Sequence, residues 1–142
     1  MGITAVNAAG DTWENATIIE NAGADAEGVV LSTFFDEAAP ANDEAASFIK
    51  GFKEYLVSIG EPDIIPAVSA LGYDAYLCLL QAIKDADSTD PAAVRDALEN
   101  VSVTGVTGDI TFNETGDANK SLAFIKTIKD GQFQFLTTTT LE

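Results

Sequence analysis

Residues 28–35, GVVLSTFF, constrain the fold more than any other segment of the sequence. They are rich in β-branched and aromatic residues, which predicts a β-strand. The nearly continuous apolar character predicts a strand buried on both faces, as in a parallel sheet. Residues 14–22 before it and the apolar positions within 46–59 after it have helical spacing. This alternation predicts an α/β fold in which helices pack on a sheet.

Further elements follow from local patterns along the chain. Residues 3–6 have β-type composition, and residues 66–86 form a long apolar segment that predicts a central helix. Asp90 and Pro91 predict a helix start, because Asp is a favoured cap and Pro is favoured at the first helical position. Residues 122–128 and 133–136 flank a turn at 129–132, which predicts a β-hairpin.

Length and charge exclude several classes of partner. The chain has 142 residues, which suits one domain, and 46% of them are hydrophobic, which favours a packed core. The formal net charge is −16, from 23 acidic and 7 basic residues. Such a polyanion repels phosphate backbones and anionic lipids, so we expect neither nucleic acid nor a membrane surface as a partner. Residues 141–142 resemble vector-derived residues, so the chain is expected to be part of a longer protein.

Histidine is absent, and Cys78 is the single cysteine. Ser-His-Asp and Cys-His catalysis and most zinc sites are therefore excluded. Cys78 lies in an apolar run, which favours a buried small hydrophobe over a reactive thiol. A carboxylate mechanism would remain, but the adjacent acids at 36–37 and 43–44 lie in a loop with nothing to hold them together. We expect no enzyme activity, no metal and no cofactor.

Residues 105–117, GVTGDITFNETGD, allow three interpretations. Ile110 and Phe112 alternate with polar residues, as in a half-buried strand, and 115–117 form a turn, so a hairpin suffices. An EF-hand calcium loop needs Gly at its sixth and Glu at its twelfth position, and neither register of this segment provides both. A phosphate-binding P-loop needs GxxxxGK[ST] before a helix, and that pattern is absent.

The same segment also resembles a family signature, G-x-x-G-x-[IL]-x-[FW]-[DN]-E-x-G-D, near the C-terminus of branched-chain amino acid binding proteins. Three other segments agree in order and spacing. Residues 71–76, LGYDAY, resemble the "ALGYDA" helix start, residues 23–30 the "AG..AEGv" passage into a strand, and residues 130–133 the "dG.f" hairpin. The resemblance covers nearly the whole chain, and the four motifs together are more specific for the family than for a ligand.

These proteins are the solute-binding components of ABC importers, and they have the type I periplasmic binding protein fold. The resemblance implies two α/β lobes, each a three-layer α/β/α arrangement, that close on a ligand. Only the C-terminal part of such a protein matches. Residues 1–64 and 119–138 would belong to one lobe, residues 65–104 to the other, and residues 105–118 would be a hinge strand. The partial fold would then be completed by dimerisation or domain swapping.

Asp11 and Trp13 are the first candidate ligand-binding residues. The resemblance implies that Asp11, in the loop Gly10-Asp11-Thr12-Trp13, pairs with the α-ammonium group of a ligand. The alternative is that Asp11 caps the helix that starts near residue 14. Trp13 is the only tryptophan and could form the wall of an apolar side-chain pocket. Its alternative is ordinary packing in the core or at an interface.

Val68 and Ser69 are the second candidate pair. They lie just before the long helix, where family members place a residue near the side chain of the ligand. Tyr73 and Asp74 are expected to fix the start of that helix rather than to contact a ligand.

The resemblance therefore implies a binding protein for branched-chain or other small amino acids. An ABC permease would be its partner, and the full-length protein would be extracytoplasmic, in the periplasm or on the cell surface as a lipoprotein. A ligand-sensing domain of a receptor or regulator with the same fold is the alternative. The chain itself is expected to lack a complete ligand site. Its bare sheet edges and apolar surfaces predict a homodimer.

Overall fold

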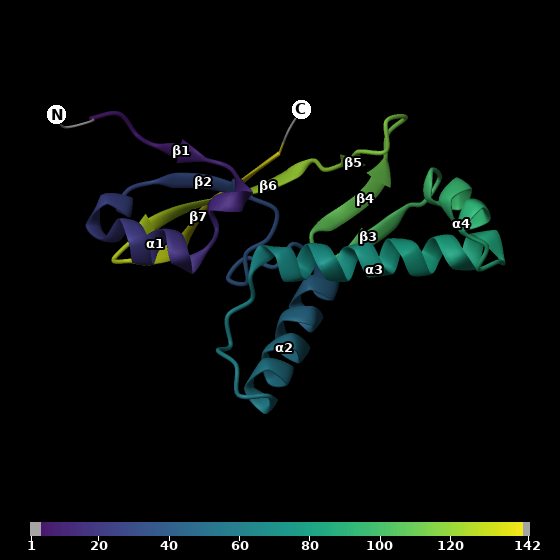
Figure 1. Ribbon diagram of the computed structural model, residues 1–142, viewed down its shortest axis with the longest axis horizontal. Helices are drawn as coiled ribbons and strands as arrows, with labels where there is room; N and C mark the ends of the chain where they lie inside the picture. Colours follow the sequence, from purple (N-terminus) through teal and green to yellow (C-terminus); the bar gives the residue numbers. More distant parts are fainter. Residues whose placement is uncertain (1–3, 141–142) are drawn as a thin grey trace.

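The computed structural model describes residues 4–140, in which two β-sheets are joined by helices (Figure 1). The four-stranded sheet has the order β1-β2-β6-β7, and its strands are Ala8–Ala9, Val30–Thr33, Leu122–Lys129 and Gln132–Thr140. The three-stranded sheet has the order β3-β4-β5, and its strands are Val103–Gly105, Gly108–Phe112 and Ala118–Asn119. Leu141 and Glu142, which the sequence suggests are vector-derived, lie outside the described residues.

The four-stranded sheet is mixed rather than parallel. β2 pairs in parallel with β1 but antiparallel with β6, which forms the predicted hairpin with β7. The prediction that residues 28–35 are buried on both faces is therefore wrong. Leu31 and Thr33 are buried, whereas Ser32 is exposed. An antiparallel neighbour allows one face of a strand to remain open to solvent.

The strand predicted at residues 3–6 is also misplaced. Residues 4–6 lie in no strand, residue 3 lies outside the described residues, and β1 begins at Ala8. Ala8 pairs with Val30 and Ala9 with Leu31. Strand pairing therefore overrides the local β-propensity of residues 3–6, as is common for β-structure.

Helix α1 (Ala16–Ala22) packs on the four-stranded sheet (Figure 1). The side chain of Ile19, on this helix, packs against a buried cluster formed by Ala26, Val29 and Ile128. Asn15 caps the helix, and its side chain accepts a hydrogen bond from the Thr17 amide at 2.9 Å. The short 3-10 helix η2 (Gly23–Ala26) then leads into β2.

Helix α2 (Asp43–Ser58) projects away from the rest of the chain in Figure 1. Its cap, Asn42, accepts a hydrogen bond from the Ala45 amide at 2.8 Å and donates one to the Gly105 carbonyl at 2.9 Å. One side chain thus fixes the helix start to β3. The ring of Phe48 lies 4.9 Å from that of Tyr73, centroid to centroid, so aromatic packing joins α2 to the following helix.

Helix α3 (Ala67–Ala86) runs beside the three-stranded sheet, and α4 (Pro91–Leu98) packs on it (Figure 1). Asp90 accepts hydrogen bonds from the Ala92 and Ala93 amides, so the predicted helix start is confirmed. Every fourth residue of α3 from Ala70 to Ala82 is buried, and these residues form one face of the helix. The opposite face is exposed, and its apolar residues include Val68, Tyr76 and Leu79.

Asp74 binds the tight turn between β3 and β4. Its carboxylate, on α3, accepts hydrogen bonds from the amides of Val106 at 2.7 Å and Thr107 at 2.9 Å, and from the Thr107 hydroxyl. A Cβ atom on Gly105 would lie 2.3 Å from Asp74 Oδ1, so only glycine fits there. Asp74 therefore binds a turn 32 and 33 residues away in the sequence, and does not fix the start of its own helix as the sequence suggested.

The hairpin interpretation of residues 105–117 is confirmed. β4 pairs antiparallel with β5, with Thr111 opposite Asn119. Asn113 Oδ1 accepts hydrogen bonds from the amides of Thr115 at 3.0 Å and Asp117 at 2.9 Å, which closes the turn. Gly116 has φ of 84°, a conformation that favours glycine.

Candidate functional site

The parallel strands β1 and β2 end at the same edge of the four-stranded sheet. The 3-10 helix η1 (Asp11–Trp13) follows β1 and packs against β2, and Asp36 follows β2. Ligands of open α/β sheets bind outside the carboxyl ends of the strands. Among the segments next to this sheet, the η1 loop is therefore best placed to contact a small ligand.

Asp11 is exposed on this loop. Its backbone carbonyl accepts a hydrogen bond from the Glu14 amide at 2.9 Å. Its side chain does not cap α1, because Asn15 fills that role. The capping alternative for Asp11 is thus wrong. Within residues 4–140 the Asp11 carboxylate has no hydrogen-bond or ion-pair partner, so it is available to a ligand.

Trp13 lies on the same turn of η1 as Asp11. It keeps 43% of its surface exposed and belongs to none of the three buried apolar clusters of the described residues. Core packing is therefore not its role within this chain. A half-exposed indole beside an exposed carboxylate can contact an apolar group and a cationic group of the same small molecule.

A buried polar cluster lies beneath this loop. The ammonium group of Lys126, on β6, contacts the Glu14 carboxylate and lies 2.8 Å from Asp36 Oδ2. The Thr33 hydroxyl donates a hydrogen bond to Glu14 Oε2 at 2.7 Å. The three charged side chains are at most 10% exposed. We call Glu14, Thr33, Asp36 and Lys126 the Lys126 cluster.

The sequence contained a signal for this cluster. β6 alternates buried and less buried residues, and Lys126 occupies the same phase as Phe124 and Ile128. A lysine at a core position of a strand needs buried partners, because an unpaired charge is costly to desolvate. Those partners are far away in sequence, at residues 14 and 36, so only the tertiary structure identifies them.

Val68 and Ser69 lie on the first turn of α3, away from the η1 loop in the chain. Val68 is 71% exposed, and Ser69 borders a hollow of about 550 Å³ between α2 and α3. That hollow is largely aromatic, and Asp11 and Trp13 do not line it; its lining residues include Phe48, Phe52, Tyr55 and Tyr73. The structure thus groups Asp11 with Trp13, and Val68 with Ser69, on separate elements.

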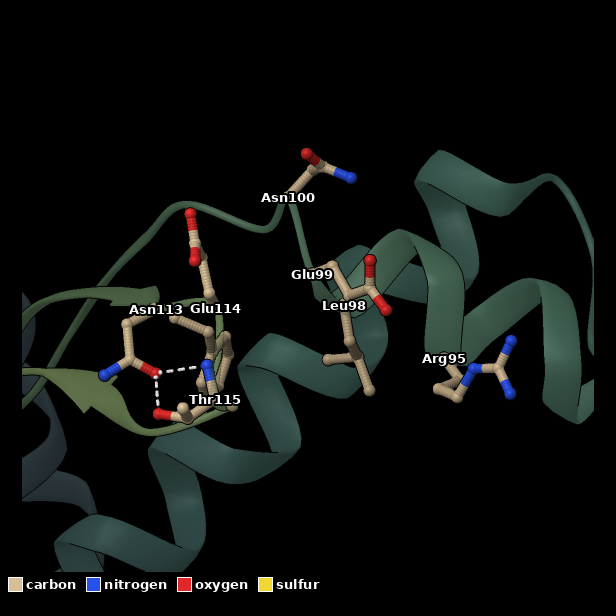
Figure 2. Close-up of a pocket in the computed structure, with 9 residues that line it drawn as sticks. Arg95, Leu98, Glu99, Asn100, Asn113, Glu114 and Thr115 are labelled. Carbon is tan, nitrogen blue, oxygen red and sulfur yellow. Dashed lines mark hydrogen bonds between the residues drawn. The ribbon is translucent and has the colours of Figure 1, made fainter.

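A larger hollow of about 660 Å³ lies between the end of α4 and the β4–β5 turn (Figure 2). Two of its polar groups are engaged elsewhere: Asn113 Oδ1 closes its own turn, and the Arg95 guanidinium pairs with Asp96. Figure 2 shows the Arg95 side chain turned away from Asn113. The elements that border this hollow, α4 and the β4–β5 turn, lie on the opposite side of the molecule from β1 and α1 in Figure 1. We therefore place the candidate site at the η1 loop.

Burial shifts the pKa of three titratable groups outside the loop, those of Cys78, Tyr73 and Lys120. Burial and the nearby Asp74 carboxylate raise the pKa of the Cys78 thiol, which favours its unreactive neutral form. Burial and the Glu44 carboxylate raise the pKa of Tyr73, and burial lowers the pKa of Lys120.

No helix among residues 4–140 has the length and apolar character needed to cross a bilayer.

Comparison with known proteins gives this site a context. The leucine-binding protein LivK of Thermotoga maritima is 32% identical and superimposes with a TM-score of 0.83, over 98% of this chain and 38% of that one. An ABC transporter substrate-binding protein of Desulfitobacterium hafniense, solved in complex with leucine, is 29% identical with a TM-score of 0.73, over 95% of this chain and 36% of that one. The present chain thus spans little more than a third of these proteins.

A third structure supports the fold alone, because its identity is only 21%. It is the branched-chain amino acid binding protein LivJ of Streptococcus pneumoniae in complex with isoleucine, with a TM-score of 0.76 over 99% of this chain and 38% of that one. The comparison with curated protein sequences gives no match. These similar structures are binding proteins rather than enzymes.

The sequence profile of periplasmic binding proteins matches residues 1–132, which is most of the chain. The mixed α/β architecture agrees with part of the type I periplasmic binding protein fold. The chain therefore belongs to the periplasmic binding protein family.

Proposed function

We propose that this chain is part of the substrate-binding component of an ABC importer for branched-chain or other small amino acids. Asp11 and Trp13, together with Val68 and Ser69, form its share of the ligand site. Solved relatives that bind leucine, one of them 32% identical, support the substrate class. Because the chain spans about 38% of the Thermotoga maritima protein, the remaining ligand contacts come from further segments.

The observation that carries this proposal is the exposed Asp11 carboxylate at the carboxyl ends of β1 and β2. A carboxylate forms strong charge-assisted hydrogen bonds with an ammonium group. These bonds gain strength when a closing cleft removes water. Trp13, on the same turn, would contact the apolar side chain of the ligand. Val68 and Ser69 would approach that side chain from α3.

The two sheets support a division of the chain between two lobes. Residues 1–64 and 119–138 would form one lobe and residues 65–104 the other, with residues 105–118 as a hinge strand. Residues 8–33 and 122–140 supply the four-stranded sheet. Residues 103–119 supply the three-stranded sheet, which therefore includes the proposed hinge strand. Hinge closure of such lobes on a ligand is the expected mechanism, with the closed form recognised by an ABC permease outside the cytoplasm.

Calorimetric titration tests the proposal. The full-length gene product is titrated with leucine, isoleucine, valine and the other common amino acids. We expect binding of at least one of the three, and loss of about 1.5–3 kcal/mol of binding free energy in Asp11→Asn, because a hydrogen bond to a charged group is removed. Asp25→Asn is the matched control, since Asp25 is also exposed. Absence of binding to the whole panel would overturn the amino-acid assignment.

We further propose that the 142-residue chain alone self-associates as a homodimer. β7 is an edge strand of nine residues, and its last residues are exposed. Unpaired strand edges and apolar surfaces such as that of α3 promote association. Light scattering across a range of concentrations tests this proposal, and a monomer at the highest concentration would contradict it.

A further inference from the structure

We propose that Glu14 is a positioning residue that holds Asp11 and Trp13 in the orientation that binds the ligand. This inference rests on the proposed function. Glu14 directly follows η1, and its amide donates a hydrogen bond to the Asp11 carbonyl at 2.9 Å. Its own side chain points into the protein and is only 10% exposed. The residue therefore joins the exposed loop to the buried Lys126 cluster.

The Glu14 carboxylate binds two different strands. Oε1 contacts the ammonium group of Lys126 on β6, and Oε2 accepts the hydrogen bond of Thr33 on β2 at 2.7 Å. Lys126 stands opposite Leu31 in the register of these strands, and Thr33 stands opposite Phe124. Both partners are thus fixed by the sheet, and they hold the carboxylate in one place.

Asp36 has a parallel role on the neighbouring loop. It lies 2.8 Å from the Lys126 ammonium group, and its other oxygen accepts a hydrogen bond from the Ala38 amide at 2.7 Å. Lys126 therefore bridges the loop after β1, through Glu14, and the loop after β2, through Asp36. Loss of Glu14 frees the loop that carries Asp11, whereas loss of Asp36 frees the other loop.

A purely stabilising role explains this arrangement poorly. Burying an ion pair costs desolvation energy, and well-packed apolar side chains of similar volume often stabilise a protein as much or more. Two carboxylates around one ammonium group also leave an excess buried negative charge. Such a cluster fixes geometry more effectively than it adds stability. The geometry that it fixes is that of the η1 loop.

The test compares Glu14→Gln with Asp36→Asn, because each removes one carboxylate from Lys126. Trp13 is the only tryptophan of the chain and reports the order of the loop directly. In the 142-residue chain, we expect acrylamide quenching of Trp13 to rise about twofold or more in Glu14→Gln, as a released indole becomes accessible. Asp36→Asn should leave this quenching unchanged. Equal quenching in Glu14→Gln and the unmodified chain, or equal increases in both variants, would overturn the proposal.

Ligand affinity provides the second readout. In the full-length gene product, Glu14→Gln should weaken binding of leucine about tenfold, while Asp36→Asn should weaken it less. If leucine binds the unmodified protein and Glu14→Gln equally well, the positioning role is wrong while the proposed function stands. If Trp13 responds as expected but no amino acid binds, the loop anchor stands and the proposed function fails.

A milder variant protects the test from misfolding. Thr33→Val keeps the shape of the side chain and removes only its hydrogen bond to Glu14. We expect a smaller increase of Trp13 quenching than in Glu14→Gln, in the same direction. If Glu14→Gln fails to fold, this variant decides the question, and unchanged quenching in Thr33→Val would then overturn the proposal.

Discussion

Asp74 and Glu14 are both buried carboxylates next to a threonine hydroxyl and a lysine, one beside each β-sheet, but their partners differ in kind. The Asp74 carboxylate accepts hydrogen bonds from two backbone amides, at 2.7 and 2.9 Å, and Lys120 Nζ lies 3.9 Å from Asp74 Oδ2. The Glu14 carboxylate instead contacts only other side chains, those of Lys126 and Thr33. The first carboxylate is satisfied by main chain and the second by other side chains.

This difference separates a structural clamp from a support for the proposed ligand-binding loop. Backbone amides of the turn bind the Asp74 carboxylate, so the β3–β4 turn and α3 behave as one unit. The Lys126 cluster depends on three charged side chains from three parts of the chain. A single substitution can therefore release the η1 loop and leave the sheet intact.

The largest predicted effect is that of Asp74→Ala. It leaves the buried amides of Val106 and Thr107 without acceptors, and each unsatisfied group costs about 1–3 kcal/mol. We expect the free energy of unfolding to fall by about 5 kcal/mol in total, measured by urea denaturation. Gly105→Ala should also destabilise the chain strongly, because its Cβ would collide with Asp74.

Asp85→Ala is the control for this prediction. Asp85 lies on the same helix and is exposed, so its removal should change stability by about 0.5 kcal/mol or less. Similar unfolding curves for Asp74→Ala and Asp85→Ala would show that Asp74 does not clamp the turn.

Lys126→Met should have the next largest effect. It leaves two buried carboxylates without a cation, which costs about 3 kcal/mol when one partner of a buried ion pair is removed. Lys129→Met is the matched control, since Lys129 ends the same strand and is exposed. Thermal unfolding measures both variants. Equal melting temperatures would mean that the Lys126 cluster contributes nothing to stability.

Asn113→Ala should be milder. The Asn113 side chain closes the exposed β4–β5 turn through hydrogen bonds to Thr115 and Asp117. Losing such local bonds costs about 1 kcal/mol. Glu114→Ala, in the same exposed turn, should be close to neutral. Urea denaturation measures these variants. If Asn113→Ala lowers the free energy of unfolding more than Lys126→Met does, the turn contributes more to stability than the Lys126 cluster, contrary to this prediction.

The smallest effect concerns pH. Burial lowers the pKa of Lys120 below its usual 10.5. Between the lowered value and 10.5, the unfolded chain binds a proton that the folded chain has released. The free energy of unfolding due to Lys120 therefore rises as pH rises through this window. The melting temperature of the unmodified chain minus that of Lys120→Met should therefore increase as pH rises over the same range. A difference that stays constant or falls would contradict this prediction.

Local patterns predicted those parts of the fold that depend on local interactions. The start of α4 at Asp90 and Pro91 and the hairpin in residues 105–117 follow from caps and turns a few residues long. β1 could not be placed, because pairing with Val30 decides its position. The contact between Asp74 and Gly105 was equally inaccessible, since it joins two motifs that are far apart in the sequence.

The candidate site was predictable only in its exposed part. Resemblance to a family pointed to Asp11 and Trp13, and the structure places both on one loop. The support beneath them was missed, although Lys126 at a core position of β6 was a visible signal. Its partners come from residues 14 and 36, and no sequence period relates them.

One pair of titrations can show whether Asp11 recognises an α-ammonium group. The full-length gene product is titrated by calorimetry with leucine and with isocaproate, which has the same carboxylate and side chain but lacks the ammonium group. We predict that leucine binds and that isocaproate binds at least about a hundredfold more weakly, as expected when a buried charge loses its partner. Equal affinities for the two compounds would contradict that recognition.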